Sequence, residues 1–526
     1  MKTVVLVGPP GAGKSTVGAR LAASLGVPFV DTDDLVAKRA SAPSAADVLR
    51  REGEPAFRAH EAAALRELFA DQSAAPRVVA TGGGTLVDRR LRHFVLDRAL
   101  LVGLDARIGT LEARLAGGPD RPLLSGPDGS DLALQRLVEL RRAAYAEAHV
   151  TIATDDLDPD SVVDAIVPWT TRDLVAMPLG ERSYAIELVR NDPTRVVDRL
   201  ASLGPSAVVL VTDARIRRAQ KKLLATMLEP LTVPLVEVVL APGEGQKTAA
   251  SVAAVWDAAL GAGIDRDAVV FGFGGGVVLD LAGFAASTLL RGIRWMSAPT
   301  TTLSMLDASV GGKTGFDHAA GKNLIGAFHQ PSAVVAELTT LQTLPERERR
   351  AGLAEAVKIG LTSDRALFER MEATADALAR GDEAALEPVL RAAIEAKARV
   401  VRDDERERGD RVILNFGHTV GHALEAHGSY ARWLHGEAVA LGILAEIAAG
   451  RALGHTPADL GIRTASLLGK LGLPFAVAPA ELAASLPWIA SDKKRRRAGL
   501  RLPVVTGVGE SRVVELPLAQ LTSALT

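Results

Sequence analysis

The sequence lacks cysteine altogether, in a chain of 526 residues. This absence excludes a disulfide framework and any metal site built on thiolates, so a bound metal ion must be held by His, Asp or Glu. An excess of either charge is also absent, because 61 Lys and Arg residues face 63 Asp and Glu residues and the formal net charge is −2. Such a chain has no general field that would recruit nucleic acid or an anionic membrane. We therefore expect small molecules as its partners, and neither nucleic acid nor membrane.

Long hydrophobic runs are missing as well. No segment approaches the roughly 18–20 uninterrupted apolar residues that cross a membrane. The first residues, MKTVVLVGPPGAGKS, lead from a short strand-like run into a glycine-rich loop, without the longer apolar segment and small-residue cleavage site of a signal peptide. These features predict a cytoplasmic protein. The 48% hydrophobic and 24% charged residues are typical of a globular chain, and the length predicts two or three domains.

Strand-like and helical segments alternate in the first part of the chain, which predicts a parallel sheet covered by helices on both faces. The strand-like runs are Thr3–Val7, Val27–Asp31, Arg77–Thr81, Leu100–Gly103 and Val150–Ala153. An acidic patch and a last short helical segment follow, and we place the end of this domain between Pro168 and Met177. The first predicted domain therefore covers residues 1–168.

The alternation then restarts, with helical periodicity between the strand-like runs. These runs are Tyr184–Val189, Ser206–Asp213, Pro234–Leu240, Ala268–Phe273 and Arg294–Ala298. From about Pro345 onward strand signals nearly vanish, and long segments rich in Ala, Leu, Glu and Arg follow. We therefore predict an α/β domain over residues 177–340 and a mainly helical domain over residues 341–526.

A phosphate-binding loop is predicted at Gly8–Ser15, GPPGAGKS, because this pattern follows a strand and opens a helix. Its glycines let backbone N–H groups converge on phosphate oxygens, and the helix N-terminus adds partial positive charge. In such a loop Lys14 reaches the β and γ phosphates and Ser15 holds Mg²⁺. An ordinary glycine turn would not require this lysine and serine. The residues expected to bind ATP here are Gly11, Ala12, Gly13, Lys14, Ser15 and Thr16.

Beyond this loop, the first domain resembles shikimate kinase along essentially its whole length. The motifs that carry the resemblance are Asp31-Thr32-Asp33, Gly53-Glu54, Phe57-Arg58, Glu61, Thr81-Gly82-Gly83-Gly84, Arg121-Pro122-Leu123-Leu124 and Leu140-Arg141-Arg142-Ala143-Ala144-Tyr145. A gluconate or nucleotide kinase is the nearest alternative.

The resemblance implies roles for these residues. Asp31 is implied to support Mg²⁺ through water, and Asp33 to bind the acceptor hydroxyls and take the proton. Arg121 is implied to close over the ATP phosphates as part of a lid, so that Lys14, Asp33 and Arg121 form the catalytic set. The residues implied to bind shikimate are Asp33, Arg58, Gly82, Gly83, Gly84 and Arg141. Arg142 remains the alternative to Arg141.

A second glycine-rich turn, Phe271–Asp280, follows a strand-like run and opens a helix. It departs from the usual dinucleotide fingerprint, so by itself it is equally consistent with an ordinary turn. The stretches Pro299–Thr314 and Gly321–Pro331 resemble 3-dehydroquinate synthase, and the resemblance spans about Met177 to Gly509. In that family the glycine turn carries the NAD pyrophosphate. The residues implied to contact NAD are Asp213, Glu244, Lys247, Gly275, Gly276, Asp280, Thr300, Thr301, Leu303, Asp307, Lys322, Thr343 and Leu344.

The same resemblance implies a zinc site formed by Glu355, His418 and His435, with Co²⁺ as a substitute. One carboxylate and two imidazoles leave open positions on zinc, as a catalytic site needs. Spacing alone gives a different pairing. His418 and His422 lie four residues apart and would share one helix face, an arrangement known from zinc sites. The resemblance instead turns His422 toward the substrate.

The substrate implied for this region is a phosphorylated seven-carbon keto acid, whose charges demand many cations. The residues implied to surround it are Arg291, Asp307, Lys313, Asn323, Lys358, Lys397, Glu407, Arg411, Asn415, His422 and Lys493. Among them Lys313, Lys358, Asn415 and His422 are implied to be catalytic. Lys494 is the alternative to Lys493. The basic run 492–497 is also consistent with a nucleic-acid patch. Near the predicted cofactor site, Arg215 departs from the family pattern.

The sequence therefore predicts an α/β chain in three parts. A P-loop kinase domain with a parallel sheet precedes an α/β NAD-binding domain and a C-terminal, mainly helical metal-binding domain. The resemblance implies two activities of aromatic amino acid biosynthesis. One is 3-phosphorylation of shikimate with ATP and Mg²⁺, and the other is conversion of 3-deoxy-D-arabino-heptulosonate 7-phosphate to 3-dehydroquinate and phosphate with NAD⁺ and Zn²⁺.

Two alternatives remain at this point. The second half is also consistent with another sugar-phosphate cyclase, of the 2-deoxy-scyllo-inosose synthase type, fused to a small-molecule kinase. A degenerate fusion with one regulatory half is the other alternative. The synthase resemblance also implies a homodimer formed through the synthase region.

Overall fold

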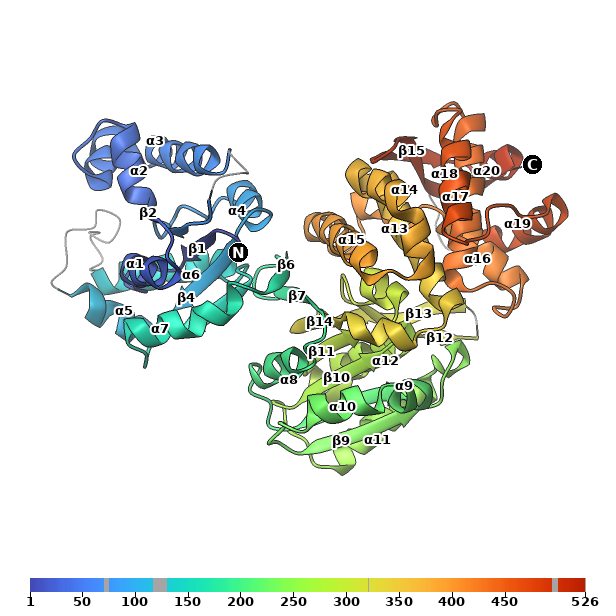
Figure 1. The fold of residues 1–526 in the computed structure, drawn as a ribbon, viewed down its shortest axis with the longest axis horizontal. Coiled ribbons are helices and arrows are strands. Elements are labelled where there is room, and N and C mark those ends of the chain that lie inside the picture. Colours follow the sequence, from blue (N-terminus) through green and yellow to red (C-terminus); the bar gives the residue numbers. More distant parts are fainter. Residues whose placement is uncertain (71–74, 117–129, 320, 494–499, 526) are drawn as a thin grey trace. The chain divides into compact units, whose positions relative to one another are not determined.

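The computed structural model describes residues 1–70, 75–116, 130–319, 321–493 and 500–525 (Figure 1). By its internal contacts the chain divides into two compact units, Met1–Glu187 and Leu188–Thr526. None of the helices among the described residues is both long and apolar enough to cross a membrane.

The first unit is built on a five-stranded parallel sheet with the strand order β2-β3-β1-β4-β5. The strands are β1 (Val4–Val7), β2 (Phe29–Asp31), β3 (Val78–Ala80), β4 (Leu100–Asp105) and β5 (Val150–Ala153). Alternate residues of β1 enter different cores: Val4 and Leu6 lie in one, and Val5 and Val7 in the other. Because successive side chains of a strand point to opposite faces, both faces of this sheet are buried.

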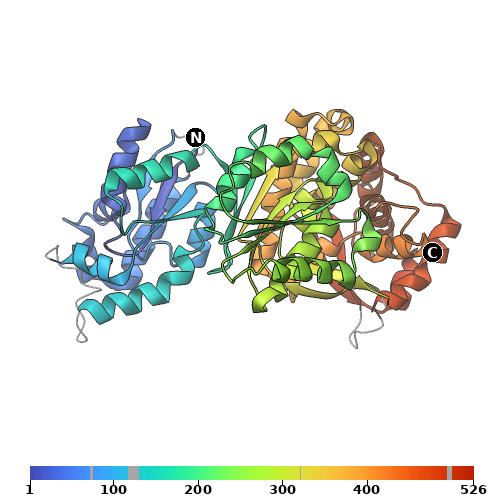
Figure 2. The ribbon, with the colours of Figure 1, turned by 90° about the horizontal axis from the view of Figure 1, so that it is seen from below.

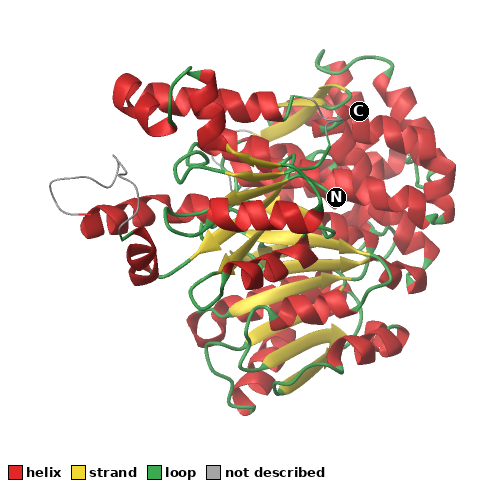
Figure 3. Cartoon of the chain, turned by 60° about the vertical axis from the view of Figure 1, so that its left-hand side comes forward, coloured by secondary structure: helices red, strands yellow, loops and turns green. Residues whose placement is uncertain are grey.

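Helices cover the two faces of this sheet (Figure 3). The described helices of this unit are α1 (Lys14–Leu25), α2 (Thr32–Arg39), α3 (Ala45–Leu68), α4 (Arg89–Leu96), α5 (Ile108–Leu115), α6 (Ser130–Tyr145) and α7 (Pro159–Ile166). Among them, α2 packs its buried Val36 against Val48 and Phe57 of α3 in a separate small core. The strands β6 (Asp173–Met177) and β7 (Tyr184–Val189) follow, and the division between the two units falls inside β7.

The second unit begins with another α/β layer, in which β14, β11, β10, β8 and β9 are neighbours in that order. Its strands are β8 (Val208–Asp213), β9 (Leu235–Leu240), β10 (Val269–Gly274), β11 (Arg294–Pro299) and β14 (Ala333–Glu337), all paired in parallel. Successive residues of β8 again alternate between two cores. Figure 2 shows helices on both sides of these strands. These helices are α8 (Thr194–Ala201), α9 (Ala214–Ala219), α10 (Lys221–Leu228), α11 (Ala249–Gly261) and α12 (Gly276–Thr288).

An antiparallel hairpin, β12 (Lys313–His318) and β13 (Gly321–Phe328), precedes β14, and helices dominate thereafter. The helices are α13 (Glu346–Ser363), α14 (Arg365–Arg380), α15 (Glu383–Asp403), α16 (His418–His427), α17 (His435–Ala452), α18 (Leu460–Lys470), α19 (Pro479–Lys493) and α20 (Leu518–Leu525). Before α20 lies a second antiparallel hairpin, β15 (Leu500–Gly507) and β16 (Glu510–Leu516), which the sequence patterns did not predict. The predicted fold class, α/β layers followed by a mainly helical part, is confirmed.

Candidate active sites

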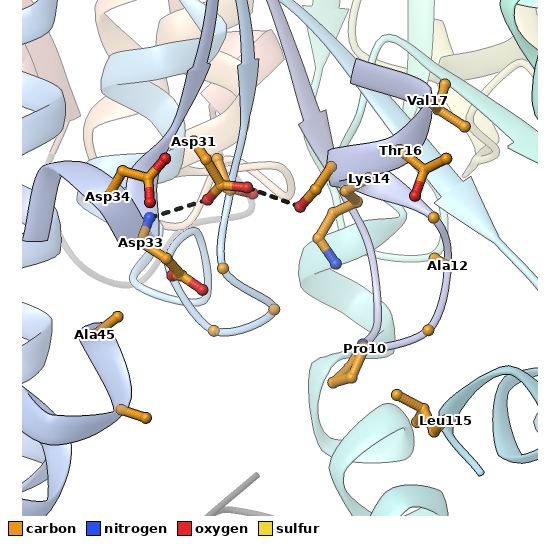
Figure 4. A pocket seen from close by; sticks show the side chains of 18 of the residues that line it. Pro10, Ala12, Lys14, Thr16, Val17, Asp31, Asp33, Asp34, Ala45 and Leu115 are labelled. Atoms are coloured by element: carbon orange, nitrogen blue, oxygen red, sulfur yellow. Dashed lines mark hydrogen bonds between the residues drawn. The ribbon is translucent and has the colours of Figure 1, made fainter. Parts of the chain in front are cut away.

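The first unit contains a pocket of about 910 Å³ at the carboxyl end of β1, lined by the glycine loop (Figure 4). Gly11 and Gly13 have positive φ angles of 83° and 91°, which glycine adopts without strain. A Cβ at Gly8 would overlap the carbonyl of Leu104. Helix α1 begins directly after the loop and has no side-chain cap, so its first backbone N–H groups remain to bind an anion. The loop therefore fits the phosphates of a nucleotide.

Charged and hydroxyl groups converge at the mouth of this loop. The Lys14 ammonium donates to the carbonyls of Gly8 and Pro9 at 2.8 Å each. The Ser15 hydroxyl donates to Asp31 at 2.7 Å, and the other oxygen of Asp31 accepts from the backbone N–H of Asp33 at 3.0 Å. Figure 4 shows Lys14, Asp31 and Asp33 around the same space. The hydroxyl and carboxylate oxygens are the ligand types that Mg²⁺ prefers.

Arg58, which also lines the pocket, is held between two carboxylates. Its guanidinium donates to Glu61 at 2.7 Å and to Glu54 at 2.9 Å. Burial opposes the charge of Arg58, but the charge of Glu61 and its hydrogen bonds raise the pKa of the guanidinium. A Cβ at Gly84 would lie 2.5 Å from the central carbon of Arg58, so this glycine makes room for the guanidinium.

The structure places the two neighbouring arginines of α6 differently. Arg141 lines the pocket together with Gly82, Gly83 and Gly84. Arg142 pairs with Glu139 at 2.8 Å, and more than half of its side chain is exposed. The hydroxyl of Tyr145 donates to the carbonyl of Gly83 at 2.6 Å and thereby ties α6 to the glycine run. Arg121, with its lid motif, and Lys494 lie outside the described residues, as does the side chain of Lys493.

In the second unit, the turn between β10 and α12 fits a pyrophosphate. Gly275 is the N-cap of α12, Gly276 is the first residue of the helix, and no side chain caps it. The backbone N–H of Thr300 donates to the carbonyl of Gly274 at 3.0 Å. The hydroxyl of Thr300 is buried and has no hydrogen-bond partner among the residues that the structure describes. A buried hydroxyl without a partner beside an uncapped helix N-terminus indicates a ligand with oxygen acceptors.

A buried ion pair lies one turn further along α12. The ammonium of Lys247 lies 2.5 Å from Asp280 and 2.5 Å from the side-chain carbonyl of Asn323, to which it donates. Burial raises the pKa of Asp280 to about 6, although Lys247 opposes this shift. Lys247 and Asp280, both predicted to contact NAD, are thereby linked to Asn323, which is predicted to contact the substrate.

Other residues predicted to contact NAD have structural partners. Asp213 caps α9 through the backbone N–H groups of residues 215 and 216 at 2.8 and 2.9 Å. Arg215, the departure from the family pattern, pairs with Glu348 at 3.1 Å. Thr343 accepts a hydrogen bond from Gln220 at 2.6 Å. Thr301 donates a hydrogen bond to the hydroxyl of Ser304, and Leu303 directly precedes the π-helix η4 (Ser304–Ala308). Leu344 directly follows the 3-10 helix η5 (Leu338–Thr343).

The π-helix η4 places Asp307 against the helical part of the unit. Such short π segments are frequent at functional sites. Lys397 of α15 donates to the backbone carbonyl of Asp307 at 2.7 Å and also to its carboxylate. Burial opposes ionisation of Asp307, but the charges of Lys397 and Lys358 hold its pKa well below the usual range. Burial lowers the pKa of Lys397 to about 8, although Asp307 opposes this shift.

Glu355 of α13, His418 of α16 and His435 of α17 form a cluster that could hold a metal ion. One Glu355 oxygen lies 3.4 Å from Nε2 of His418 and 3.8 Å from Nε2 of His435. This oxygen is buried and has no hydrogen-bond partner in the described part of the chain, whereas the other accepts from Lys358. His418 donates from Nδ1 to the carbonyl of Phe416 at 3.1 Å, which leaves Nε2 with its lone pair. The donor set and the unsatisfied carboxylate oxygen fit zinc.

A second cluster shares one of these histidines and contains His422, Glu425 and His435. The ring centroid of His422 lies 5.3 Å from that of His418 and 5.8 Å from that of His435. His435 faces Glu425 through Nδ1 and Glu355 through Nε2. The unsatisfied oxygen of Glu355 favours the first cluster as the metal site.

Close helix packing positions the three side chains of the first cluster. A Cβ at Gly436 would overlap the carbonyl of Ala351 on α13, and one at Gly442 would overlap the carbonyl of Gly417. Helix α17 therefore approaches α13 and α16 through their backbones. The buried carboxylate of Glu446 on α17 accepts from the backbone N–H groups of Gly417 and Val420 at 2.8 and 3.2 Å. It caps the N-terminus of α16, which has no cap of its own.

Hydrogen bonds join three further residues predicted to bind the substrate. Glu407 accepts from Lys313 and from the side-chain amide of Asn415. Arg411 is buried, and its guanidinium donates to the carbonyl of Gly311 at 3.2 Å. Arg291 does not join these contacts in the described part of the chain. It is exposed, in the 3-10 turn η3 (Leu289–Arg291), with a φ of 71°.

Sequence reasoning assigned no role to Glu425 or Glu446, although both are buried beside the histidine cluster. For Glu425 a signal existed, because His418, His422 and Glu425 follow the spacing i, i+4, i+7 of one helix face. Glu446 follows His435 by eleven residues, a spacing that does not single it out among the many residues of a buried helix.

Together, the fold and the two sites are those of a P-loop kinase joined to an enzyme with a nucleotide-binding α/β domain and a cluster of two histidines and a glutamate that could hold a metal ion. The family model of shikimate kinase matches residues 10–171. The models described as 3-dehydroquinate synthase N-terminal and C-terminal match residues 237–351 and 352–495.

Three relatives illustrate the likeness. The 3-dehydroquinate synthase of Halorhodospira halophila (strain DSM 244 / SL1) is 44% identical over 338 residues, covering 64% of this chain and 93% of that protein. That of Pelobacter propionicus (strain DSM 2379 / NBRC 103807 / OttBd1) is 39% identical over 358 residues, covering 66% and 97%. The solved structure of a 2-epi-5-epi-valiolone synthase from Streptomyces hygroscopicus subsp. jinggangensis 5008, with NAD⁺ and Zn²⁺ bound, is 28% identical with a TM-score of 0.58, covering 65% of this chain and 95% of that one.

The chain belongs to the 3-dehydroquinate synthase family, and its first part is a shikimate kinase domain. It is a bifunctional enzyme of the shikimate pathway, with a kinase and a lyase activity, which confirms the prediction from the sequence.

Proposed function

We propose that the first unit transfers the γ-phosphoryl group of ATP to the 3-hydroxyl of shikimate with Mg²⁺. Independently, the second unit converts 3-deoxy-D-arabino-heptulosonate 7-phosphate to 3-dehydroquinate and phosphate, with NAD⁺ and with Zn²⁺ or Co²⁺. The observation that carries the second assignment is the buried, unsatisfied Glu355 oxygen between the Nε2 atoms of two histidines. The curated relatives, which are synthases of this name at 39–44% identity, favour this substrate over that of another cyclase.

The kinase roles follow from the contacts in the pocket. In the proposal Lys14 and the backbone of the loop bind the nucleotide phosphates, and Ser15 with Asp31 holds Mg²⁺. Asp33 binds the acceptor hydroxyl and takes its proton. Arg58 and Arg141 approach the pocket from different helices and clamp the acceptor carboxylate.

In the synthase, NAD⁺ supplies a hydride acceptor and Zn²⁺ a Lewis acid when they are bound. In the proposal Glu355, His418 and His435 hold the metal, and the turn at Gly275 and Gly276 holds the pyrophosphate. Lys313, Lys358 and Asn415 bind and orient the anionic substrate, each already fixed by a carboxylate partner. His422 lies beside the metal cluster and moves a proton.

One coupled assay tests the assignment of substrates. Purified protein supplied with the heptulosonate phosphate, NAD⁺ and ATP is expected to release phosphate and stop at dehydroquinate, because dehydration and reduction separate that product from shikimate. Shikimate supplied with ATP is expected to be phosphorylated independently. Omission of NAD⁺ and use of a hexose 6-phosphate serve as controls. Release of phosphate from the hexose phosphate instead of the heptulosonate phosphate would identify another cyclase. Appearance of shikimate 3-phosphate from the heptulosonate phosphate alone would refute the assignment.

The glycine run offers a test of the acceptor site. In Gly84→Ala the new Cβ is expected to displace the Arg58 guanidinium from its place between Glu54 and Glu61. Loss of a charge-assisted hydrogen bond is worth roughly 1.5–3 kcal/mol, so KM for shikimate should rise about 10–100-fold. KM for ATP should change little, because the phosphate loop is untouched. Steady-state kinetics with each substrate varied in turn measures both values. Equal increases in the two KM values would contradict this assignment.

A homodimer formed through the synthase region and a cytoplasmic location belong to the same proposal, and both rest on the sequence. Sedimentation or light scattering of the full chain measures the first, and a monomeric full chain would rule out the homodimer.

A further inference from the structure

Glu425 contacts both His435 of the metal cluster and Lys322, a residue predicted to contact NAD. It lies on α16 and is 3% exposed. One of its oxygens accepts a hydrogen bond from Nδ1 of His435 at 3.1 Å. The other accepts from the ammonium of Lys322, on strand β13, at 3.4 Å. Each carboxylate oxygen therefore has a partner from a different element.

Lys322 extends this chain of contacts away from the metal cluster. Its ammonium also lies 3.2 Å from Glu244 and 4.4 Å from the ring centre of Tyr430. Burial opposes the charge of Lys322, but the charges of Glu425 and Glu244 raise its pKa. Glu425 therefore connects the β12–β13 hairpin with His435.

The contact with Glu425 determines how His435 presents its ring. A histidine that donates from Nδ1 to a carboxylate keeps its lone pair on Nε2 and has a fixed ring plane. Nε2 of His435 is the atom that faces the unsatisfied oxygen of Glu355. Without Glu425, the ring could turn or carry its proton on Nε2, and either change removes the lone pair from the metal side.

We propose that Glu425 is a positioning residue of the metal centre: it fixes the tautomer and ring plane of His435, and it couples this ligand to Lys322 of the hairpin. The inference rests on the proposed metal site at Glu355, His418 and His435. The neighbouring arrangement, in which Glu425 itself binds the metal with His422, is the alternative that the experiment must separate.

The test measures zinc affinity of the full chain by competition with a chromophoric chelator, so that no catalytic readout is needed. In Glu425→Ala, zinc affinity is expected to fall about 10–100-fold, which is the usual effect of removing the hydrogen-bond acceptor behind a metal-binding histidine. Glu425→Gln is expected to lose less, because the glutamine side-chain carbonyl can still accept from Nδ1 of His435. Lys322→Met is expected to cause a smaller loss, and combining it with Glu425→Ala should add almost nothing, because both changes break one chain of contacts. Glu372→Gln is the matched control. It removes the charge of a helical glutamate that pairs with Arg463 and belongs to neither candidate metal cluster, and its zinc affinity should equal that of the wild type.

Two comparisons decide the outcome. His435→Ala is measured alongside: if it keeps wild-type zinc affinity, the proposed metal site fails, whatever Glu425 does. If His435→Ala loses zinc while both Glu425 variants stay within about twofold of the wild type, the inference is overturned and the metal site stands. Loss of zinc in Glu425→Ala as complete as in His435→Ala also overturns it, because Glu425 would then be a ligand. Thermal unfolding of the metal-free variants should match the wild type, and a loss of stability without zinc would show a merely structural role.

Discussion

Replacement of Lys14 by alanine is expected to lower phosphoryl transfer to shikimate by about 10²–10³-fold, since it removes a charge that stabilises the transition state. The synthase rate of the same protein should stay within about twofold of the wild type. The reason is that Lys14 belongs to the compact unit of residues 1–187, whereas the synthase residues lie in the unit that begins at Leu188. Both rates are measured on one preparation, with shikimate and ATP in one assay and the heptulosonate phosphate and NAD⁺ in the other.

Lys38→Ala is the matched control for this variant, because it removes an exposed lysine from α2 of the same unit. It should leave both rates unchanged. Lys14 also donates to two carbonyls of its own loop, so the thermal unfolding of Lys14→Ala must be compared with that of the wild type. A tenfold loss of synthase activity in a variant that remains folded would show that the two halves are coupled, contrary to this interpretation.

The parallel strands were predictable because their sequences carry the information locally. The run predicted at Thr3–Val7 is strand β1, Val4–Val7, and all its residues are buried. Short apolar runs rich in Val, each followed by a helical pattern, are compatible with few folds other than a parallel sheet covered by helices. The two hairpins were not predictable in this way. Strand β13 is mostly exposed and contains two glycines, and β15 contains Pro503, which argues against a strand when the sequence is considered alone. Their pairing depends on neighbours that the local pattern does not reveal.

In the candidate sites, too, only part of the arrangement was predictable from the sequence. A motif predicted the phosphate loop, and the family resemblance predicted the histidines and most of the charged residues. The partners that hold these residues come from distant parts of the chain. Lys397 meets Asp307 across 90 positions, and Lys322 meets Glu425 across 103. No spacing rule connects residues that far apart, because tertiary packing alone brings them together. The same holds for Glu446, whose role as a cap depends on the crossing of α16 and α17.

The second large effect is expected from replacing His435 or His422. His435→Ala is expected to lose bound zinc and synthase activity together, whereas His422→Ala should keep zinc and lose mainly turnover. The structure supplies the reason. The unsatisfied Glu355 oxygen faces Nε2 of His418 and of His435, and His422 is not part of that cluster. Helical spacing alone would have paired His418 with His422 on the metal. Zinc content by elemental analysis, with the synthase rate measured on the same samples, distinguishes the two arrangements.

His427→Ala is the matched control, because His427 is an exposed histidine at the end of the same helix α16. It should keep both zinc and activity, and all three variants should phosphorylate shikimate at the wild-type rate. Zinc that is lost from His422→Ala but retained in His435→Ala would rule out the cluster of Glu355, His418 and His435. The same zinc contents would also reveal a site formed by His422, Glu425 and His435, because both variants would then be depleted. Only a metal held by Glu355, His418 and His435 predicts a depleted His435→Ala beside a fully loaded His422→Ala.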